Sequence, residues 1–371
     1  MNAGIYLHIP FCKSRCSYCD FATDVYRDAG TVDRYVDAIC REIDLFDGNV
    51  LADTIYFGGG TPSLLAVEQT KRILDVVRGR IDIAVEAEVT MEMNPATVTP
   101  ESLAAYRELG VNRASFGVQT FDDRDLKLLA RGHDANDARS TFAMLRDAGF
   151  DNVSFDLIAG LPGQKLEQWQ RNLDEAISLS PEHISLYLLE IHEGTPLAEQ
   201  IRSGRRPLPD DELAAEMYEL MLDRLFAAGY QQYEISNFSK PGFEARHNTK
   251  YWRLDPVYGF GVSAHSFDGM RRYANERDTA KYVEMIERGG AAKVMREGVA
   301  LASEFVFLGL RMEDGIDLDD YRRRFASDLF ATHRNEIREL VGKQLLMIEG
   351  ERIRLTPHGK LFSNEVFAAF V

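Results

Sequence analysis

The chain alternates short β-prone runs with helical stretches, and this alternation limits its fold more than any other feature of the sequence. Glycines at positions 110, 149 and 229 stand where a helix can end in a left-handed residue before the next strand. The pattern predicts parallel strands joined by helices, as in a doubly wound sheet or a barrel. The expected strands are residues 5–9, 54–57, 88–93, 113–118, 153–158 and 184–189, and the expected helices are 32–46, 67–77, 100–109, 137–148 and 166–179.

Polar residues stand where these expected strands end. Three thiols follow the first strand, and a glycine-rich turn at residues 58–62 follows the second. Glu92 ends the third strand, Gln119 follows the fourth, and His192 comes after the sixth. Barrel enzymes keep their sites on the rim formed by the carboxyl ends of the strands. The placement of these residues therefore favours a barrel with a site on that rim.

The three thiols belong to Cys12, Cys16 and Cys19, which lie in one short loop. Gaps of three and two residues let three sulfurs face one small centre, as iron–sulfur ligation requires, and one iron would then lack a protein ligand. Lys13 and Arg15 stand between the thiols, where positive charge favours thiolates. A structural zinc site is the alternative, but such sites usually combine two ligand pairs, and no second pair lies near this loop.

Length and charge set the broad class of the protein. A chain of 371 residues holds one large or two modest domains. Its net charge of −16 disfavours nucleic-acid binding. The sequence shows neither a signal peptide nor an apolar run of about 18 residues, so we expect a cytoplasmic protein. The fourth cysteine, Cys40, falls on the apolar face of an expected helix and is interpreted as core packing.

The second half of the chain begins with a polar hinge at residues 205–211 and a helix around 213–225. An irregular section is expected over 233–265, and the glycine-rich residues 289–292 indicate a joint. The sequence thus predicts two domains, residues 1–290 and residues 291–371. The second domain is expected to be mostly helical and winged-helix-like, with helices near 300–310, 321–325 and 331–340 and a hairpin of 345–348 with 352–355.

The cysteine pattern CxxxCxYC after an N-terminal strand resembles the radical S-adenosylmethionine (SAM) superfamily. The segment Tyr6-Leu7-His8-Ile9-Pro10-Phe11-Cys12 is similar to the branch that contains the oxygen-independent coproporphyrinogen dehydrogenases and the HemW haem chaperones. This resemblance implies an α/β fold with a partial (β/α)6 TIM-like barrel. It also implies a 4Fe-4S cluster held by the three loop cysteines, whose open iron chelates SAM before one electron cleaves it to a 5′-deoxyadenosyl radical.

The resemblance implies a set of SAM contacts on the rim. The turn Gly58-Gly59-Gly60-Thr61-Pro62 resembles the family's GGGTP, where the backbone reaches the methionyl group, and a bare glycine turn is the alternative. Glu92 suits ribose hydroxyls or the ammonium group, unless it is a surface charge on an alternating strand. Arg131 suits a carboxylate, but it could equally be an exposed helix residue. The other implied contacts are Tyr6, Tyr18, Gln119 and Asp156.

The segment His247-Asn248-Thr249-Lys250-Tyr251-Trp252 resembles the HNxxYW signature of the haem chaperones, in which the histidine is the candidate haem ligand. Imidazole is a good axial ligand for haem iron, and the two aromatic rings could stack on the porphyrin. The alternative is a histidine and two aromatic residues that pack the barrel mouth. His265 could be a second haem or proton-handling group, although a polar loop residue is the favoured interpretation.

Two departures separate the chain from the coproporphyrinogen dehydrogenases that it resembles. Those enzymes place a further cysteine where this chain has Phe21, and they carry a long N-terminal extension, whereas eleven residues precede Cys12 here. We therefore expect a haem chaperone that holds a 4Fe-4S cluster and SAM and passes haem to acceptor proteins. The alternative is a coproporphyrinogen III dehydrogenase. An RNA-modifying enzyme is disfavoured by the net charge.

The resemblance leaves the enzymatic role open, because the residues allow SAM cleavage but speak against coproporphyrinogen oxidation. The expected partners are haem and haem-acceptor proteins, and nucleic acid is not expected. The family also implies peripheral contact with membranes, for which the sequence offers no evident surface, and it allows a homodimer.

Overall fold

The computed structural model describes residues 2–295 and 300–371. Its centre is a twelve-stranded sheet in the order β14-β13-β12-β11-β1-β4-β5-β6-β7-β8-β10-β9. The sheet curves without closing, because β14 and β9 form its two ends. Six adjacent parallel strands confirm the predicted partial barrel: β1 (Ala3–Ile9), β4 (Leu51–Gly59), β5 (Asp82–Met93), β6 (Arg113–Gln119), β7 (Val153–Ala159) and β8 (His183–Leu188).

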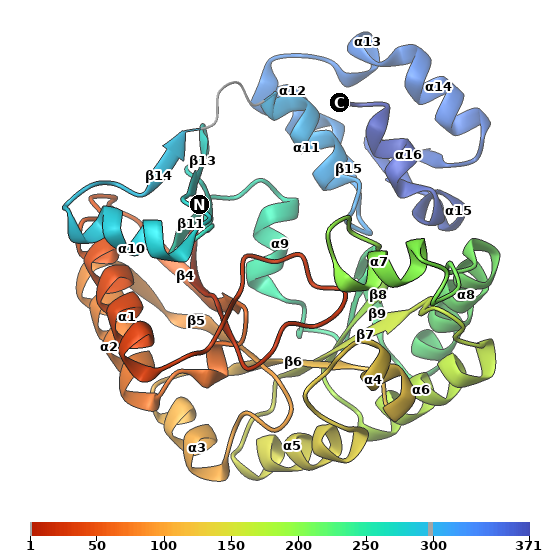
Figure 1. Cartoon of the computed structure of the whole chain (residues 1–371). Helices are drawn as coiled ribbons and strands as arrows, with labels where there is room; N and C mark the ends of the chain where they lie inside the picture. The colour runs from red at the N-terminus through yellow and green to blue at the C-terminus, as the bar shows by residue number, and fades with distance from the viewer. Residues whose placement is uncertain (1, 296–299) are drawn as a thin grey trace.

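Helices cover the outer face of the curved sheet, as Figure 1 shows. Three of the parallel strands are almost wholly buried: β6 at every position, and β1 and β7 at all but one. The three expected helix-ending glycines have φ angles of 92°, 80° and 84°, which confirms their left-handed conformation. The covering helices are α1 (Ala29–Asp44), α2 (Val67–Arg80), α3 (Pro100–Glu108), α5 (Ala135–Asp147), α6 (Leu166–Leu179) and α8 (Asp211–Ala227).

The section that was expected to be irregular contains short elements that extend the sheet at both sides. β9 (Gln231–Glu234) and β10 (Asn237–Ser239) continue the sheet beyond β8. After α9 (Arg246–Trp252), strand β11 (Val257–Phe260) pairs in parallel with β1. Strands of three or four residues are too short to show a period in the sequence, which explains why they were not predicted.

Beyond β11 the chain forms an antiparallel extension of β12 (His265–Phe267), β13 (Arg272–Asn275) and β14 (Lys293–Met295). The helix α10 (Thr279–Glu287) connects β13 to β14 and packs against α1. The large sheet therefore continues to residue 295.

The C-terminal residues fold into a smaller helical domain with its own apolar core and a three-stranded sheet in the order β15-β17-β16. Helices and hairpin follow one another in the predicted winged-helix order. The elements are α11 (Leu301–Gly309), β15 (Ile316–Asp317), α12 (Leu318–Phe325), α13 (Leu329–Thr332), α14 (Arg334–Gly342), β16 (Leu346–Glu349), β17 (Arg352–Leu355), α15 (Pro357–Leu361) and α16 (Ser363–Ala368).

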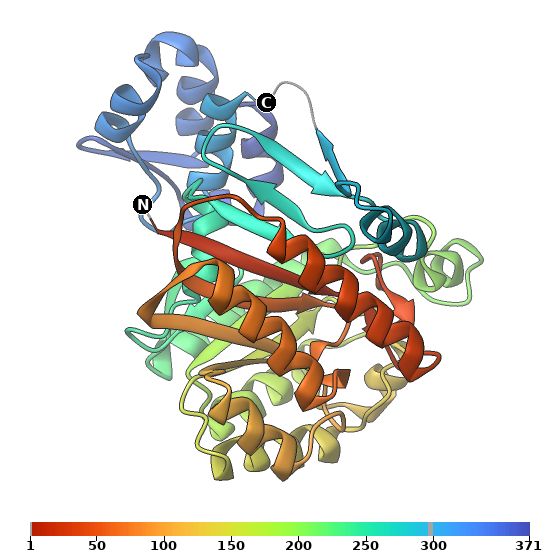
Figure 2. The same cartoon turned by 90° about the vertical axis from the view of Figure 1, so that its left-hand side faces the viewer.

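This C-terminal domain packs against the end of the large sheet, beside β11–β14 in Figure 2. Leu254 and Phe267 of the larger domain belong to its apolar core. Backbone hydrogen bonds also cross the boundary, from Ile235 N to the carbonyl of Arg311 at 3.1 Å and from Glu313 N to that of Tyr233 at 3.0 Å. The two domains are therefore joined by main-chain pairing as well as by apolar contact.

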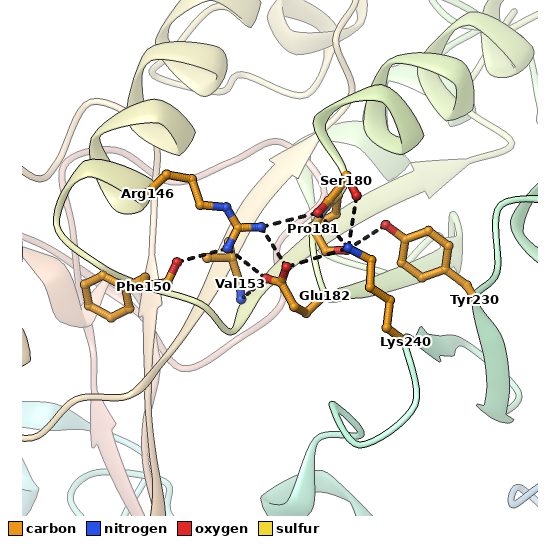
Figure 3. A network of polar contacts seen from close by, with 8 residues as sticks. All are labelled: Arg146, Phe150, Val153, Ser180, Pro181, Glu182, Tyr230 and Lys240. Atoms are coloured by element: carbon orange, nitrogen blue, oxygen red, sulfur yellow. Dashed lines mark hydrogen bonds and ion pairs between the residues drawn. The ribbon is translucent and has the colours of Figure 1, made fainter.

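The amino-terminal ends of β7 and β8 are tied together by a polar network around Glu182 (Figure 3). Arg146 donates to both carboxylate oxygens of Glu182 at 2.9 Å, and Val153 N donates to one of them at 3.1 Å. Lys240, which follows β10, donates to the carbonyl of Ser180 at 3.0 Å and lies 3.7 Å from Glu182. Residues at the amino-terminal rim of a barrel commonly stabilise the fold, whereas the functional site lies at the opposite, carboxyl-terminal rim.

Among residues 2–295 and 300–371, the structure contains no helix that is both long and apolar enough to cross a membrane.

Candidate functional site

A cavity of about 510 Å3 opens on the rim formed by the carboxyl ends of the parallel strands. The cysteine loop, the glycine turn after β4 and the ends of β5, β6, β7 and β8 line it. Of the site residues that the sequence predicts, Tyr6 and His247 do not reach this cavity. All the others line it, including the three loop cysteines.

Main-chain pairing closes the cysteine loop at its base. Strand β2 (Phe11–Cys12) pairs with β3 (Asp24–Val25), and Tyr26 N donates to the carbonyl of Cys12 at 2.8 Å. In the middle of the loop, Ser17 donates through its backbone N to the carbonyl of Leu129 and through its hydroxyl to that of Leu128, both at 2.9 Å. The loop is therefore fixed at both ends and at its centre.

A chain of hydrogen bonds runs around the thiols. The Thr61 hydroxyl lies 3.6 Å from Cys12 Sγ and accepts a 2.8 Å hydrogen bond from Asn94 Nδ2. Arg131 then donates to Asn94 Oδ1 at 2.6 Å, and its Nη1 lies 3.6 Å from Cys16 Sγ. Two of the three sulfurs are thus held by one connected set of side chains.

Burial and nearby positive charge shift the pKa values of the thiols in opposite directions. Burial raises the pKa of Cys12 to about 11, and burial also raises the pKa of Cys19. The Lys13 ammonium donates instead to the carbonyl of Ala96 at 3.3 Å. Arg15 lowers the pKa of Cys19, which is the expected direction for a positive charge, but burial has the larger effect on both thiols. Cluster binding has to displace their protons.

The glycine turn brings backbone close to the cysteine loop. A Cβ atom on Gly60 would lie 2.7 Å from the carbonyl carbon of Pro10, so this position has no room for a side chain. Gly59 has a φ of 114° and donates its N–H to Glu92 Oε2 at 3.0 Å. The turn thus lines the cavity with main chain, as close approach of a ligand requires.

Glu92 and Asp156 place two carboxyl groups in the cavity. Tyr56 donates to Glu92 Oε1 at 2.7 Å. Burial raises the pKa of Glu92 to about 7, although the Tyr56 hydrogen bond opposes this shift. Burial likewise raises the pKa of Asp156 to about 6, against the attraction of Arg113. Glu92 is therefore not the surface charge that the sequence left as an alternative.

Arg131 lies after the short helix α4 (Asp123–Leu128) and reaches into the cavity. Its Nη2 donates to the carbonyl of Gly117 at 2.6 Å, and its Nη1 lies 3.5 Å from the Tyr18 hydroxyl. Its Nε is buried and has no hydrogen-bond partner in the described part of the chain. This side chain is not an exposed helix residue, and it offers one free donor for an anionic ligand group.

His247 lies in α9 beneath the rim and is only 1% exposed. Its Nδ1 shares a 2.8 Å hydrogen bond with Thr54 Oγ1, and its Nε2 shares a 3.1 Å hydrogen bond with the Tyr251 hydroxyl. Its ring stacks on those of Tyr56 and Tyr6, at centroid distances of 5.0 and 6.3 Å. Burial lowers its pKa to about 3. Both ring nitrogens are therefore engaged.

The cavity also contains residues that the sequence did not predict. Arg311, just after α11, lines it from the C-terminal domain and forms an ion pair with Glu234 at 3.3 Å. Its guanidinium lies over the ring of Trp252, 4.3 Å from the centroid. Arg311 is distant from every rim motif in the sequence, so no sequence signal could have placed it there. Tyr187, at the end of β8, is a further unpredicted lining residue.

Two family models match the chain. The model of the radical SAM superfamily matches residues 6–176, and the model of the HemN C-terminal domain matches residues 300–362. The first match lies within the larger domain and the second within the C-terminal domain.

The curated relatives include proteins named "Heme chaperone HemW". The protein of this name from Bacillus subtilis is 36% identical over 99% of this chain and 98% of its own length. Its counterpart from Lactococcus lactis is 34% identical over 99% and 96%. The Escherichia coli protein of this name is 40% identical over 71% of this chain and 69% of its own length.

Among solved structures, the coproporphyrinogen III oxidase HemN from Escherichia coli has a similar fold, with a TM-score of 0.86. The match covers 100% of this chain and 90% of that chain. Its sequence identity of 23% shows a shared fold alone.

Proposed function

The chain belongs to the HemW heme chaperones of the radical SAM superfamily, and from this membership we propose that it binds haem and delivers it to acceptor proteins. The observation that carries the proposal is similarity along the whole chain, which includes both domains, to relatives named as haem chaperones. The likeness to coproporphyrinogen III oxidase is one of fold and gives no reason to assign that reaction.

The proposal includes a 4Fe-4S cluster on Cys12, Cys16 and Cys19. Their thiols line one cavity, and a cluster with three protein ligands keeps one iron free for SAM. When bound, the cluster supplies the electron for reductive cleavage of SAM. The chain itself orients the thiols through the loop contacts and through the Thr61–Asn94–Arg131 hydrogen bonds.

The same cavity offers a complementary group for each part of SAM. The main chain of Gly59 and Gly60 lets the methionyl group approach closely. The free Nε donor of Arg131 suits its carboxylate. Glu92 accepts hydrogen bonds from the ribose hydroxyls or the ammonium group, and Tyr18 forms a wall near the adenine.

Haem ligation by His247 stays a prediction, and it requires a second arrangement of the chain. In the arrangement described here, Thr54 and Tyr251 occupy both imidazole nitrogens. For Nε2 to reach iron, the hydrogen bond to Tyr251 has to break and the buried imidazole has to become accessible.

The test begins with anaerobic reconstitution, followed by iron, sulfide and zinc analysis and by haem titration. We expect about four irons and about four sulfides per chain, with about one haem bound. Stoichiometric zinc with no iron, or the absence of saturable haem binding, would contradict the proposal.

Two further measurements refine the test. The spectrum and haem affinity of His247→Ala decide whether this histidine is the ligand. An anaerobic assay with reductant, SAM and coproporphyrinogen III should release no carbon dioxide. Carbon dioxide release would instead identify an enzyme.

A further inference from the structure

The cavity at the carboxyl ends of the parallel strands is here called the SAM cavity, after the ligand proposed for it. A second cavity, of about 520 Å3, lies on the other side of the cysteine loop. The loop and the strand β3 form one wall, and the beginnings of α1 and α10 form the other. Phe21 and Thr23 line both cavities, so this part of the loop is the partition between them. The volume falls within the range of about 300–1,000 Å3 that is usual for small-molecule sites.

Positive charge gathers in this second cavity although the chain as a whole carries −16. Arg15, Arg27, Arg34 and Arg277 line it, against two aspartates. Arg34 is paired with Glu287 at 2.6 Å, and Arg277 donates to a carbonyl of the cysteine loop. Arg15 and Arg27 form no hydrogen bond or ion pair with any residue that the structure describes. Two guanidinium groups are thus available to a ligand.

The same cavity exposes an apolar surface beside these charges. Phe21 is 63% exposed and Val25 is 50% exposed, and the buried side chains of Phe11 and Val283 line its deeper part. Exposed aromatic side chains at a concave site are a common mark of ligand binding. Thr23 Oγ1 is buried and has no hydrogen-bond partner in the described residues, which is uncommon for a buried hydroxyl.

We propose that this second cavity is the docking site for haem. The flat apolar macrocycle would lie against Phe21 and Val25, and its two propionates would pair with Arg15 and Arg27. The inference rests on the proposed function and adds the place where haem binds. The cysteine loop would then lie between haem and SAM. His247, which lines neither cavity, would not touch haem when it first binds.

The test uses the reconstituted full chain and three probes: haem, iron-free protoporphyrin IX and the dimethyl ester of protoporphyrin IX. The ester lacks both carboxylates. We expect wild type to bind the two dicarboxylates and to bind the ester about tenfold more weakly, which is the effect of one charge-assisted contact. Arg27→Glu should lose about tenfold for the dicarboxylates and nothing for the ester, and Phe21→Ser should weaken all three probes.

The matched control is Arg41→Glu, which makes the same charge change in α1, the helix that begins two residues after Arg27, but does not line the cavity. It should bind like wild type, and all variants should keep their iron and sulfide content. If Arg27→Glu and Phe21→Ser bind haem like wild type, the docking site is wrong while haem binding itself stands. Displacement of haem by inorganic phosphate would identify a small-anion site and overturn the inference. No haem binding by wild type would overturn the proposed function as well.

Discussion

Tyr56 donates a 2.7 Å hydrogen bond from its hydroxyl to Glu92 in the SAM cavity, and its ring stacks on that of His247 with a centroid distance of 5.0 Å. The tyrosine therefore connects the HNxxYW segment to a carboxyl group of the rim. Because the hydrogen bond stabilises the ionised carboxylate, it holds the pKa of Glu92 below the value that burial alone would give.

Tyr56→Phe should weaken SAM binding at neutral pH by about three- to tenfold, since loss of the hydrogen bond raises the pKa of Glu92 and leaves less carboxylate. Isothermal titration of the reconstituted protein with SAM measures this effect. Raising the pH to about 8.5 should restore most of the affinity, because the carboxyl group then ionises. A loss that is the same at every pH would show that Tyr56 acts only through packing.

The SAM affinity of wild type should rise about tenfold between about pH 6 and about pH 8, as Glu92 with a pKa of about 7 changes from mostly protonated to mostly ionised. The affinity rises with pH because only the ionised carboxylate accepts hydrogen bonds at both oxygens. Glu92→Gln should bind SAM weakly, and its affinity should not rise between about pH 6 and about pH 8. The charge of Asp156, whose own pKa is about 6, contributes to the raised pKa of Glu92, so Asp156→Asn should move the rise in SAM affinity to lower pH.

Gly60→Ala should lower the iron content after reconstitution, because its Cβ would lie 2.7 Å from the carbonyl carbon of Pro10 and would push the cysteine loop away. Gly79→Ala in α2 is the matched control. A Cβ there meets nothing within 4 Å, and alanine in a helix stabilises by about 0.5–1 kcal/mol relative to glycine. Equal iron content in both variants would show that the loop accommodates the methyl group.

Glu182→Gln should lower the free energy of unfolding by about 2 kcal/mol, since it removes the charge that Arg146 and Lys240 face at the amino-terminal rim (Figure 3). Urea unfolding measures the loss, and SAM binding should stay unchanged. Glu175→Gln breaks a more exposed pair with Arg139 and should cost less than about 1 kcal/mol. Similar losses in the two variants would show that the network adds nothing beyond a surface pair.

The sequence was sufficient to predict the six parallel strands and the rim, because strands of six or more residues alternate regularly with capped helices along the chain. It was not sufficient for β9, β10 and β11, whose few residues carry no period. The strand β11 is nonetheless the parallel neighbour of β1 and places α9 beneath the rim.

The candidate site divides in the same way. Cys12 follows and Glu92 ends a predicted strand, so their meeting on one rim follows from the topology. For Arg131, only the family resemblance indicated a place there. The enclosure of His247 does not, because its partner Thr54 is 193 residues away in sequence and only the folded chain brings them together. The same holds for Arg311, whose place on the rim depends on how the C-terminal domain docks.

Arg311 lines the SAM cavity from a domain that leaves the ribosome after the barrel. A chain still under synthesis can form the cysteine loop and the barrel strands long before this guanidinium exists. Loading of the cofactor before that point would therefore meet an unfinished wall, and the order of assembly favours insertion after the C-terminal domain has docked.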